Sequence, residues 1–166
     1  MGQMEIVTRL DQSQIDEAVA LIDEITLHDG LSPISEHVFL HLRHGGDDQG
    51  LHFLKFEESA LIAYAHLDIT DKVEGPSAEI AVAPDFRRQG LGTELIRALV
   101  DAAPAGNLRL WAHGEQAIAG QWAKAMGFRH ARTLWQMRRS LPAVPEQAQS
   151  AHLRRRLGIH HWLSGA

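Results

Sequence analysis

The feature that most constrains the fold is a glycine-punctuated turn in the middle of the chain, PDFRRQGLG at 84–92, which leads directly into the amphipathic run TELIRALVDAA. A helix N-terminus has backbone N–H groups without intrahelical partners and carries a partial positive charge. Glycines in the preceding turn let an anion approach those groups without a Cβ in the way. Residues 88–93 are therefore predicted to form an anion cradle, with an ordinary strand-to-helix turn as the alternative.

The same turn differs from two well-known phosphate-binding loops. It lacks the Gly-Lys-Ser/Thr ending with which a P-loop holds a metal-bound triphosphate. It also contains only one part of the dinucleotide-binding fingerprint. We therefore expect the ligand of this turn to be a pyrophosphate group bound without a metal ion.

Composition narrows the class of protein. A chain of 166 residues with 45% hydrophobic residues has the size and apolar content of one domain. The net charge of −5 argues against general nucleic-acid binding, and the absence of cysteine excludes disulfides and thiol nucleophiles. No apolar run approaches membrane-spanning length and the N-terminus has no signal-peptide core, so we expect a cytoplasmic protein with no membrane partner.

The apolar periodicity predicts two helices in the first part of the chain. Asp11 and Gln14 form a capping-box-like start for a helix that runs to about His28. A second, shorter helix ends at a Gly-Gly pair, and either Ser32 or Ser35 is its N-cap.

Short stretches of β-branched and aromatic residues predict the strands. They are VTRL (7–10), LHFLKF (51–56), ALIAYAHLDIT (60–70), SAEIAVAP (77–84), LRLWAH (108–113) and ARTLWQMRRSL (131–141). Helices over about 93–103 and 115–126 separate the last three. Strands joined by short turns should pair antiparallel, and the two strands joined through the glycine turn and its helix should pair in parallel. The predicted fold class is α/β (α+β), a mixed, mostly antiparallel sheet with helices on both faces.

The stretch IAVAPDFRRQGLGTELI resembles the acetyl-CoA-binding motif of the GCN5-related N-acetyltransferase (GNAT) superfamily, with Arg87, Gly90 and Gly92 at the fixed positions. AKAMGF resembles the second motif of that family, and the order of elements agrees over roughly 5–141. The resemblance implies acetyl-CoA as cosubstrate and no metal. The implied cofactor-binding residues are Ile80, Ala81 and Val82 beside the pantetheine arm and Arg87, Arg88, Gln89, Gly90, Leu91, Gly92 and Thr93 around the pyrophosphate.

Three further stretches, DGLSPISEHV, LRLWAHG and LWQMRRSL, resemble the N-terminal half of the mycothiol synthase family, which acetylates the cysteinyl amine of a glucosaminyl-inositol conjugate with two tandem domains. We expect one GNAT domain over 1–141, then a linker and short basic tail over 142–166. The expected function is acetyl-CoA-dependent N-acetylation of a small primary amine, with that cysteinyl amine as the leading acceptor. The alternative is a non-catalytic acetyl-CoA-binding domain, and the sequence leaves a homodimer open.

Acetyl transfer needs a base for the ammonium group of the acceptor and a donor for the oxyanion. The resemblance makes Glu79 the expected base, because it begins the strand that lines the thioester; a solvated strand-end glutamate is the alternative. His113 is a second candidate, either as a base or to orient the acceptor, unless it is a hydrogen-bonded loop histidine. The N–H of Val82 or Ala83 would serve the oxyanion.

Two positions depart from the pattern of the family. Ala123 stands where the second motif commonly has a tyrosine acid, and Gln116 where an asparagine is usual. Tyr64, the only tyrosine, lies on another strand and is expected to pack in the sheet. A thiolate can still leave unaided, because the pKa of a thiol is about 8.5.

Two other groups of polar residues have candidate roles. The mycothiol synthase resemblance gives Glu36 a substrate-contacting role, with a favourable first-turn helix charge as the alternative. His37 and His41 lie one helical turn apart, but no third ligand is apparent among the eleven histidines, so no metal site is predicted. The arginines at 154–156 make the tail locally basic, which indicates a partner contact or disorder.

Overall fold

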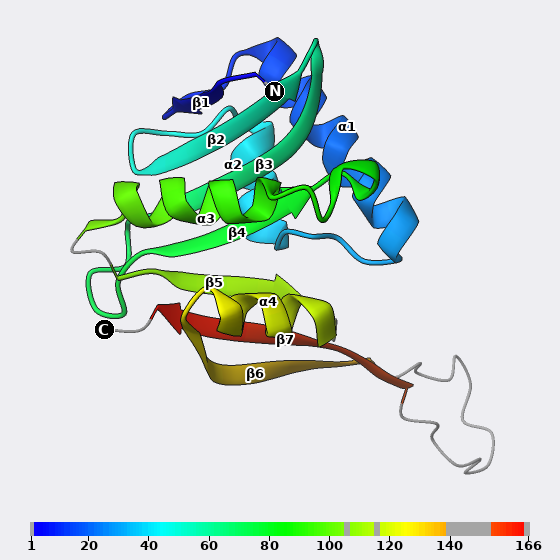
Figure 1. The fold of residues 1–166 in the computed structure, drawn as a ribbon, viewed down its shortest axis with the longest axis vertical. Coiled ribbons are helices and arrows are strands. Elements are labelled where there is room, and N and C mark those ends of the chain that lie inside the picture. Colours follow the sequence, from blue (N-terminus) through cyan, green and yellow to red (C-terminus); the bar gives the residue numbers. More distant parts are fainter. Residues whose placement is uncertain (1, 105–106, 115–116, 139–153, 165–166) are drawn as a thin grey trace, which may run out of the picture.

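The computed structural model describes residues 2–104, 107–114, 117–138 and 154–164. They form one mixed sheet of seven strands in the order β1-β2-β3-β4-β5-β7-β6, with helices on both faces (Figure 1). Within these residues no helix combines the length and apolar character needed to cross a membrane. The predicted fold class is confirmed.

The strands are β1 (Met4–Val7), β2 (Gly50–Glu57), β3 (Ala60–Asp68), β4 (Ser77–Val82), β5 (Arg109–His113), β6 (Phe128–Arg138) and β7 (Arg154–Ser164). The α-helices are α1 (Gln12–Asp29), α2 (Glu36–Arg43), α3 (Leu91–Ala102) and α4 (Ala117–Ala125), and a short 3-10 helix covers Pro84–Phe86. Neighbours β1 to β4 pair antiparallel, and β4 pairs in parallel with β5. The antiparallel pairs from β2 to β4 and the parallel pair of β4 with β5 are as predicted, with the crossover running through the glycine turn and α3.

The first two helices begin where side chains satisfy free N–H groups. Before α1, the carboxylate of Asp11 accepts from the N–H of Gln14 at 2.8 Å, and the Gln14 amide oxygen accepts from the N–H of Asp11 at 3.0 Å. Before α2, the hydroxyl of Ser35 accepts from the N–H of Val38 at 3.3 Å. Of the two predicted caps for the second helix, Ser35 is therefore correct.

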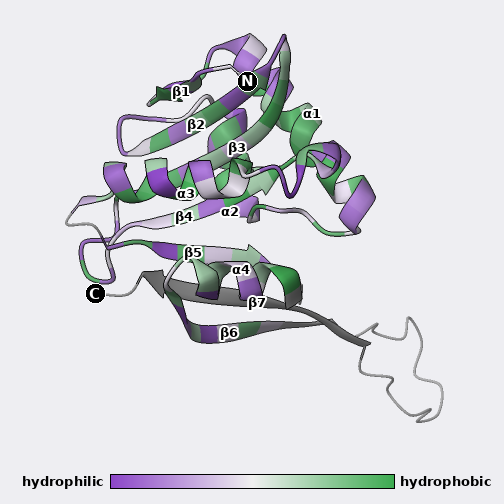
Figure 2. Ribbon diagram, in the orientation of Figure 1, coloured by the Kyte–Doolittle hydropathy of each residue, from purple (hydrophilic) through white to green (hydrophobic). Residues whose placement is uncertain are grey.

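Two apolar clusters lie on opposite faces of the sheet. On one face, α3 packs Leu95 and Leu99, both fully buried, against β2 and β3. On the other, α1 and α2 pack Ile22 and Leu42 against the reverse side of the same strands. Figure 2 shows the alternation of hydrophobic and hydrophilic residues along α1 and α3 that this arrangement requires.

Two segments differ from the sequence-based expectation. The first strand is Met4–Val7 rather than 7–10, because Leu10 packs in the cluster of α1 and α2 and its N–H donates to the carbonyl of Gly45 at 2.8 Å. Part of the predicted tail, Arg154–Ser164, is strand β7, which pairs antiparallel with both β5 and β6. The arginines at 154–156 were interpreted as a basic tail, but they belong to a strand that pairs with β5, which is distant in the chain.

Candidate active site

Strands β4 and β5 are held together at one end and diverge at the other. Within the described residues they pair at two positions, beginning with Ser77 opposite Arg109. The buried guanidinium of Arg109 fixes this end by donating to the carboxylates of Glu74 and Asp71 at 2.5 and 3.0 Å. The carboxyl ends of the two strands are therefore free to separate.

Every second residue of β4 directs its backbone N–H and C=O toward this opening. Ala83 donates its N–H to the carbonyl of Ile62 in β3 at 2.9 Å, and the antiparallel register places Ala63 opposite Val82. Hydrogen-bonded and non-hydrogen-bonded pairs alternate in such a ladder, so Ile80 and Val82 direct their N–H and C=O groups away from β3. Of the two predicted oxyanion donors, Ala83 is therefore occupied, and Val82 faces the opening.

A cavity of about 720 Å³, here called the large cavity, occupies the opening and extends to the start of α3. Eight of the ten predicted cofactor-binding residues line it, namely Ile80, Ala81, Val82, Arg87, Arg88, Gly90, Gly92 and Thr93. The remaining two do not: the amide of Gln89 donates to the carbonyl of Asp85 at 3.0 Å, and Leu91 is buried in the core. The contiguous segment 80–93 thus supplies one wall of the cavity.

The predicted anion cradle lies in this wall, at the start of α3. Gly90 has φ 91°, in the left-handed region that disfavours a Cβ, and α3 has no side-chain N-cap hydrogen bond. The first N–H groups of the helix, on Leu91, Gly92 and Thr93, are therefore available to a ligand. A Cβ on Gly92 would lie 3.1 Å from the ring of Trp122 in α4, so a side chain at this position would require the ring to shift.

Arg87 lines the large cavity, and its guanidinium is held by partners at the end of α1 and in the turn. Its two terminal nitrogens donate to the carboxylate of Asp29 at 2.9 and 2.8 Å, and its Nε donates to the carbonyl of Val82 at 3.1 Å. The hydrogen bond from Arg87 lowers the pKa of Asp29 below its usual value. Arg88, which has a φ of 62°, also lines the large cavity, and its side chain is exposed.

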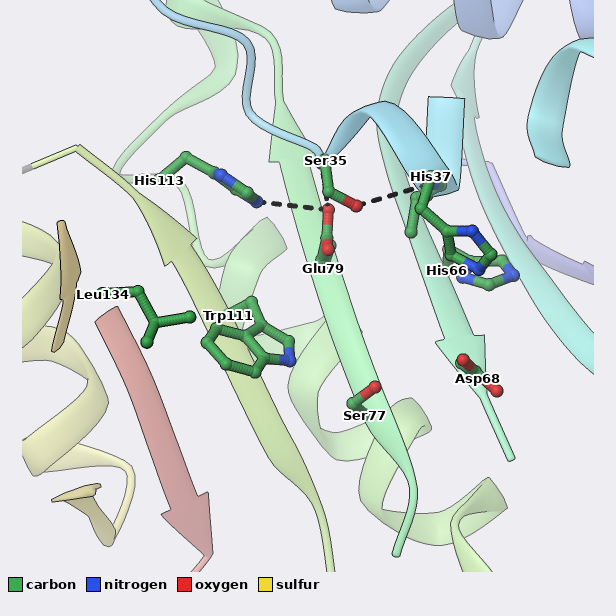
Figure 3. Close-up of a pocket in the computed structure, with 10 residues that line it drawn as sticks. Ser35, His37, His66, Asp68, Ser77, Glu79, Trp111, His113 and Leu134 are labelled. Atoms are coloured by element: carbon green, nitrogen blue, oxygen red, sulfur yellow. Dashed lines mark hydrogen bonds and ion pairs between the residues drawn. The ribbon is translucent and has the colours of Figure 1, made fainter. Parts of the chain in front are cut away.

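A second cavity of about 280 Å³, here called the small cavity, lies beside α2. Its polar lining residues are Ser35, His37, His66, Asp68, Ser77, Glu79 and His113 (Figure 3). Trp111 and His113, both on β5, line the small and the large cavity alike. The two cavities therefore meet at the carboxyl end of β5.

The two predicted catalytic residues lie together at this junction. Nε2 of His113 is 3.3 Å from Oε2 of Glu79, and the same oxygen accepts from the N–H of Ser35 at 2.5 Å (Figure 3). Both side chains are largely buried, at 9% and 8% exposed. Among the described residues, Oε1 of Glu79 has no hydrogen-bond donor, so it is the oxygen available to a molecule in the small cavity.

A family model described as "Acetyltransferase (GNAT) family" matches residues 21–128, which includes the cradle and both catalytic candidates. The chain belongs to this family. Among curated relatives, a mycothiol acetyltransferase of Acidothermus cellulolyticus is 51% identical over 136 residues, which are 80% of this chain and 41% of the relative. A mycothiol acetyltransferase of Streptosporangium roseum is 46% identical over 138 residues, 82% of this chain and 41% of the relative. The chain spans about two fifths of the length of these relatives.

Solved structures agree with the GNAT fold. The ribosomal-protein-S18-alanine N-acetyltransferase of Escherichia coli superposes with a TM-score of 0.64 at 21% identity, over 98% of this chain and 93% of that one. An aminoglycoside 6'-N-acetyltransferase complexed with coenzyme A gives 0.64 at 9% identity, over 98% and 96%. At such identities the likeness concerns the fold alone.

This GNAT domain has no tyrosine at the large cavity within its described residues. Ala123, at the position of the family tyrosine, is buried and lines the cavity, and Trp122 beside it points its Nε1 at the hydroxyl of Thr93, 3.4 Å away. Tyr64 packs in the sheet as predicted, hydrogen-bonded to His52, and burial holds the pKa of Tyr64 far above its usual value. Gln116 lies outside the described residues.

Glu36 does not join the site of this GNAT domain. It is the first residue of α2, its side chain is exposed, and neither cavity includes it, although its neighbours Ser35 and His37 line the small cavity. A helix first turn favours an acidic residue, which accounts for its position. The carboxylate that the sequence analysis missed is Asp68, at the end of β3, which lines the small cavity.

The structure separates the histidine pair that the sequence analysis considered as metal ligands. His37 lines the small cavity, whereas His41 packs against the rings of His52 and His66. Burial, reinforced by the neighbouring histidines, lowers the pKa of His52 to about 3 and that of His66 to about 4. No sequence spacing signals this cluster, because its members come from one helix and two strands.

Proposed function

We propose that this GNAT domain transfers the acetyl group of acetyl-CoA to a small primary amine, with the cysteinyl amine of a glucosaminyl-inositol conjugate as the leading acceptor. The observation that carries the proposal is the meeting of two cavities at the Glu79–His113 pair. Family membership supports the reaction type, and the name of the relatives, mycothiol acetyltransferase, supports the acceptor.

The large cavity fits acetyl-CoA in size and chemistry. Its volume of about 720 Å³ suits an elongated cofactor, and the free N–H groups at the start of α3 suit a pyrophosphate. Arg88 adds a positive charge at the same end, and Ile80, whose backbone groups face away from β3, offers its N–H and C=O to the amides of a pantetheine arm. When bound there, acetyl-CoA supplies a thioester carbonyl that an amine can attack.

The small cavity suits a cationic amine. Asp68 and Glu79 present carboxylates to it, and both would attract the ammonium form of the acceptor. Although burial acts to raise the pKa of Asp68, its hydrogen bonds with Thr70, including the N–H donated at 2.7 Å, keep that pKa below the usual value. Asp68 is therefore ionised at neutral pH and can bind an ammonium group.

The Glu79–His113 pair is the proposed base. Glu79 takes a proton from the ammonium through Oε1, and His113, in contact with the other oxygen, stands between the two cavities to orient the amine. The N–H of Val82 is the proposed oxyanion donor, since that of Ala83 is occupied. The thiolate leaves without a side-chain acid, because a thiol pKa of about 8.5 makes it an adequate leaving group, and it takes up the second proton of the attacking nitrogen.

The composition of the chain bears on where the protein works and on what it binds. We expect a cytoplasmic protein whose partner is a small molecule rather than a nucleic acid, in keeping with the net charge of −5. The proposed transfer step uses no metal ion. A homodimer stays a prediction.

The test is calorimetric titration with acetyl-CoA, followed by a free-thiol release assay over a panel of small amines that includes the cysteinyl glucosaminyl-inositol. We expect saturable binding and thiol release that depends on the amine. Binding with no release from any amine would establish the non-catalytic alternative, which the alanine at position 123 would then explain. No binding at all would remove the acetyl-CoA assignment.

A further inference from the structure

A cluster of three histidines lies behind α2, outside the large cavity. His41 comes from α2, His52 from β2 and His66 from β3, and one ring nitrogen of each lies within 4.8 Å of the others. His52 and His66 are cross-strand partners, so both point to the face that α2 covers. The three ring centroids are 4.9 to 5.6 Å apart. The fold therefore brings together three imidazoles from segments that are separate in sequence.

The Nε2 atoms of this cluster are buried and have no partner within the described part of the chain. This holds for His41, His52 and His66 alike. Buried polar atoms in native proteins nearly always have a hydrogen-bond partner, so three such nitrogens in one place need an explanation. The neighbouring acid is Asp47, whose Oδ1 is 4.0 Å from Nε2 of His41.

The surroundings of the cluster are arranged as they are around metal-binding histidines. Nδ1 of His52 is 2.8 Å from the hydroxyl of Tyr64; when Nδ1–H donates to that oxygen, Nε2 keeps its lone pair. A Cβ on Gly46 would overlap Nε2 of His52, and one on Gly50 would lie 2.9 Å from Nε2 of His66. Gly46 and Gly50 flank the loop that carries Asp47. Because neither has a side chain, the loop can lie close to the ring nitrogens.

We propose that His41, His52 and His66 bind a divalent transition-metal ion, with Asp47 or a water molecule as the fourth ligand. Three imidazoles and an oxygen suit Zn²⁺ in tetrahedral coordination. Zn–N bonds of about 2.0–2.1 Å would place the nitrogens roughly 3.4 Å apart. The nitrogens, now within 4.8 Å of one another, would therefore have to approach by about 1 Å when the ion binds. No cysteine is needed, which fits a chain that has none.

The ion would act as a clamp between α2 and the sheet. The N-cap of α2, Ser35, holds Glu79 through its N–H, and the helix carries His41 near its other end. Fixing His41 to β2 and β3 therefore also fixes the wall of the small cavity, which His66 lines. The site is separate from the proposed acetyl-CoA cavity, none of whose lining residues belongs to the cluster.

The experiment uses the full chain without a histidine tag, dialysed against a chelator and titrated with Co²⁺. We expect one ion per chain, ligand-field absorption in the visible typical of tetrahedral Co²⁺, and loss of that absorption when Zn²⁺ is added in equal amount. The thermal unfolding midpoint should rise with metal, because an ion that binds only the folded chain stabilises it.

Matched variants locate the site. His41→Gln should weaken Co²⁺ binding by at least about tenfold, whereas His44→Gln, an exposed histidine at the end of the same helix, should leave it unchanged. His41 is the ligand of choice because its side chain is 21% exposed, whereas loss of the fully buried His52 risks unfolding the chain. Absence of stoichiometric binding, or equal weakening in both variants, would overturn the proposal and leave a buried water as the partner of these nitrogens.

Discussion

The large and the small cavity lie side by side at the opening between β4 and β5, but they are built in different ways. One wall of the large cavity is a single contiguous segment, 80–93, in which a strand, a turn and a helix start follow each other. The small cavity draws its residues from α2, β3, β4, β5 and β6. The first can be recognised in the sequence as a motif, whereas the second exists only once the chain has folded.

Among the variants that compare the two cavities, the largest effect is expected on the large cavity, from Gly92→Glu. The new side chain would meet the ring of Trp122 and place a negative charge among the N–H groups at the start of α3. Affinity for acetyl-CoA should fall by at least about 100-fold, or roughly 3 kcal/mol, in calorimetric titration. Gly92→Ala, which adds only the Cβ, should lose less. Unchanged affinity in Gly92→Glu would show that the pyrophosphate does not bind at the start of α3.

A smaller effect on the same side is expected from Asp29→Asn, which breaks the bidentate pair with Arg87. The free energy of unfolding should fall by about 2 kcal/mol in urea titration, because Asp29 is only 14% exposed. Asp48→Asn is the control, since its pair with Arg9 is 78% and 64% exposed and should contribute under about 1 kcal/mol. Equal losses in the two variants would contradict a special role for the Arg87 pair.

The same pair predicts a pH dependence. The folded chain holds the pKa of Asp29 below its unfolded value, so the stabilisation is fully present above the ordinary aspartate pKa of about 3.9. It is lost as the pH falls through the lowered value. The difference in unfolding free energy between the wild-type chain and Asp29→Asn should therefore shrink in strongly acidic buffer, and a constant difference would argue against the ion pair.

On the acceptor side, Asp68→Asn should raise the KM for the amine about tenfold, or about 1.4 kcal/mol. The carboxylate lines the small cavity, and its loss leaves Glu79 as the remaining acid for the ammonium there. The dissociation constant for acetyl-CoA should not change, because Asp68 does not line the large cavity. A shift in both constants would mean that the two cavities do not act as separate sites.

The smallest effect is expected from Glu36→Gln. The side chain is exposed and lines neither cavity, so steady-state constants for both substrates should match those of the wild-type chain. A KM for the amine raised as much as in Asp68→Asn would restore the substrate contact that the sequence suggested.

Local signals in the sequence explain which predictions succeeded. The capping box at Asp11, the antiparallel hairpins and the glycine turn each depend on residues within a few positions of one another. Contacts over long separations escaped prediction. Arg87 and Asp29 are 58 residues apart, and Ser35 and Glu79 are 44 apart. Strand β7 pairs with β5 although α4 and β6 lie between them in the chain.

The histidine cluster also depends on contacts that spacing along the sequence does not predict. Helical spacing suggested His37 with His41, yet only His41 belongs to the cluster, because α2 turns it toward the strand pair of His52 and His66. A cross-strand register of two strands cannot be read from the spacing of fourteen residues between those histidines in the chain. Sequence spacing predicts ligands on one helix better than ligands shared between a helix and a sheet.

The most direct test of Glu79 as the base at the junction of the two cavities is the variant Glu79→Gln. We predict that turnover with the best amine falls by about 10²- to 10⁴-fold while acetyl-CoA binds as tightly as before, with the exposed Glu24→Gln as the control. Turnover equal to that of the control would contradict the assignment, and the proton of the amine would then have to leave by another route.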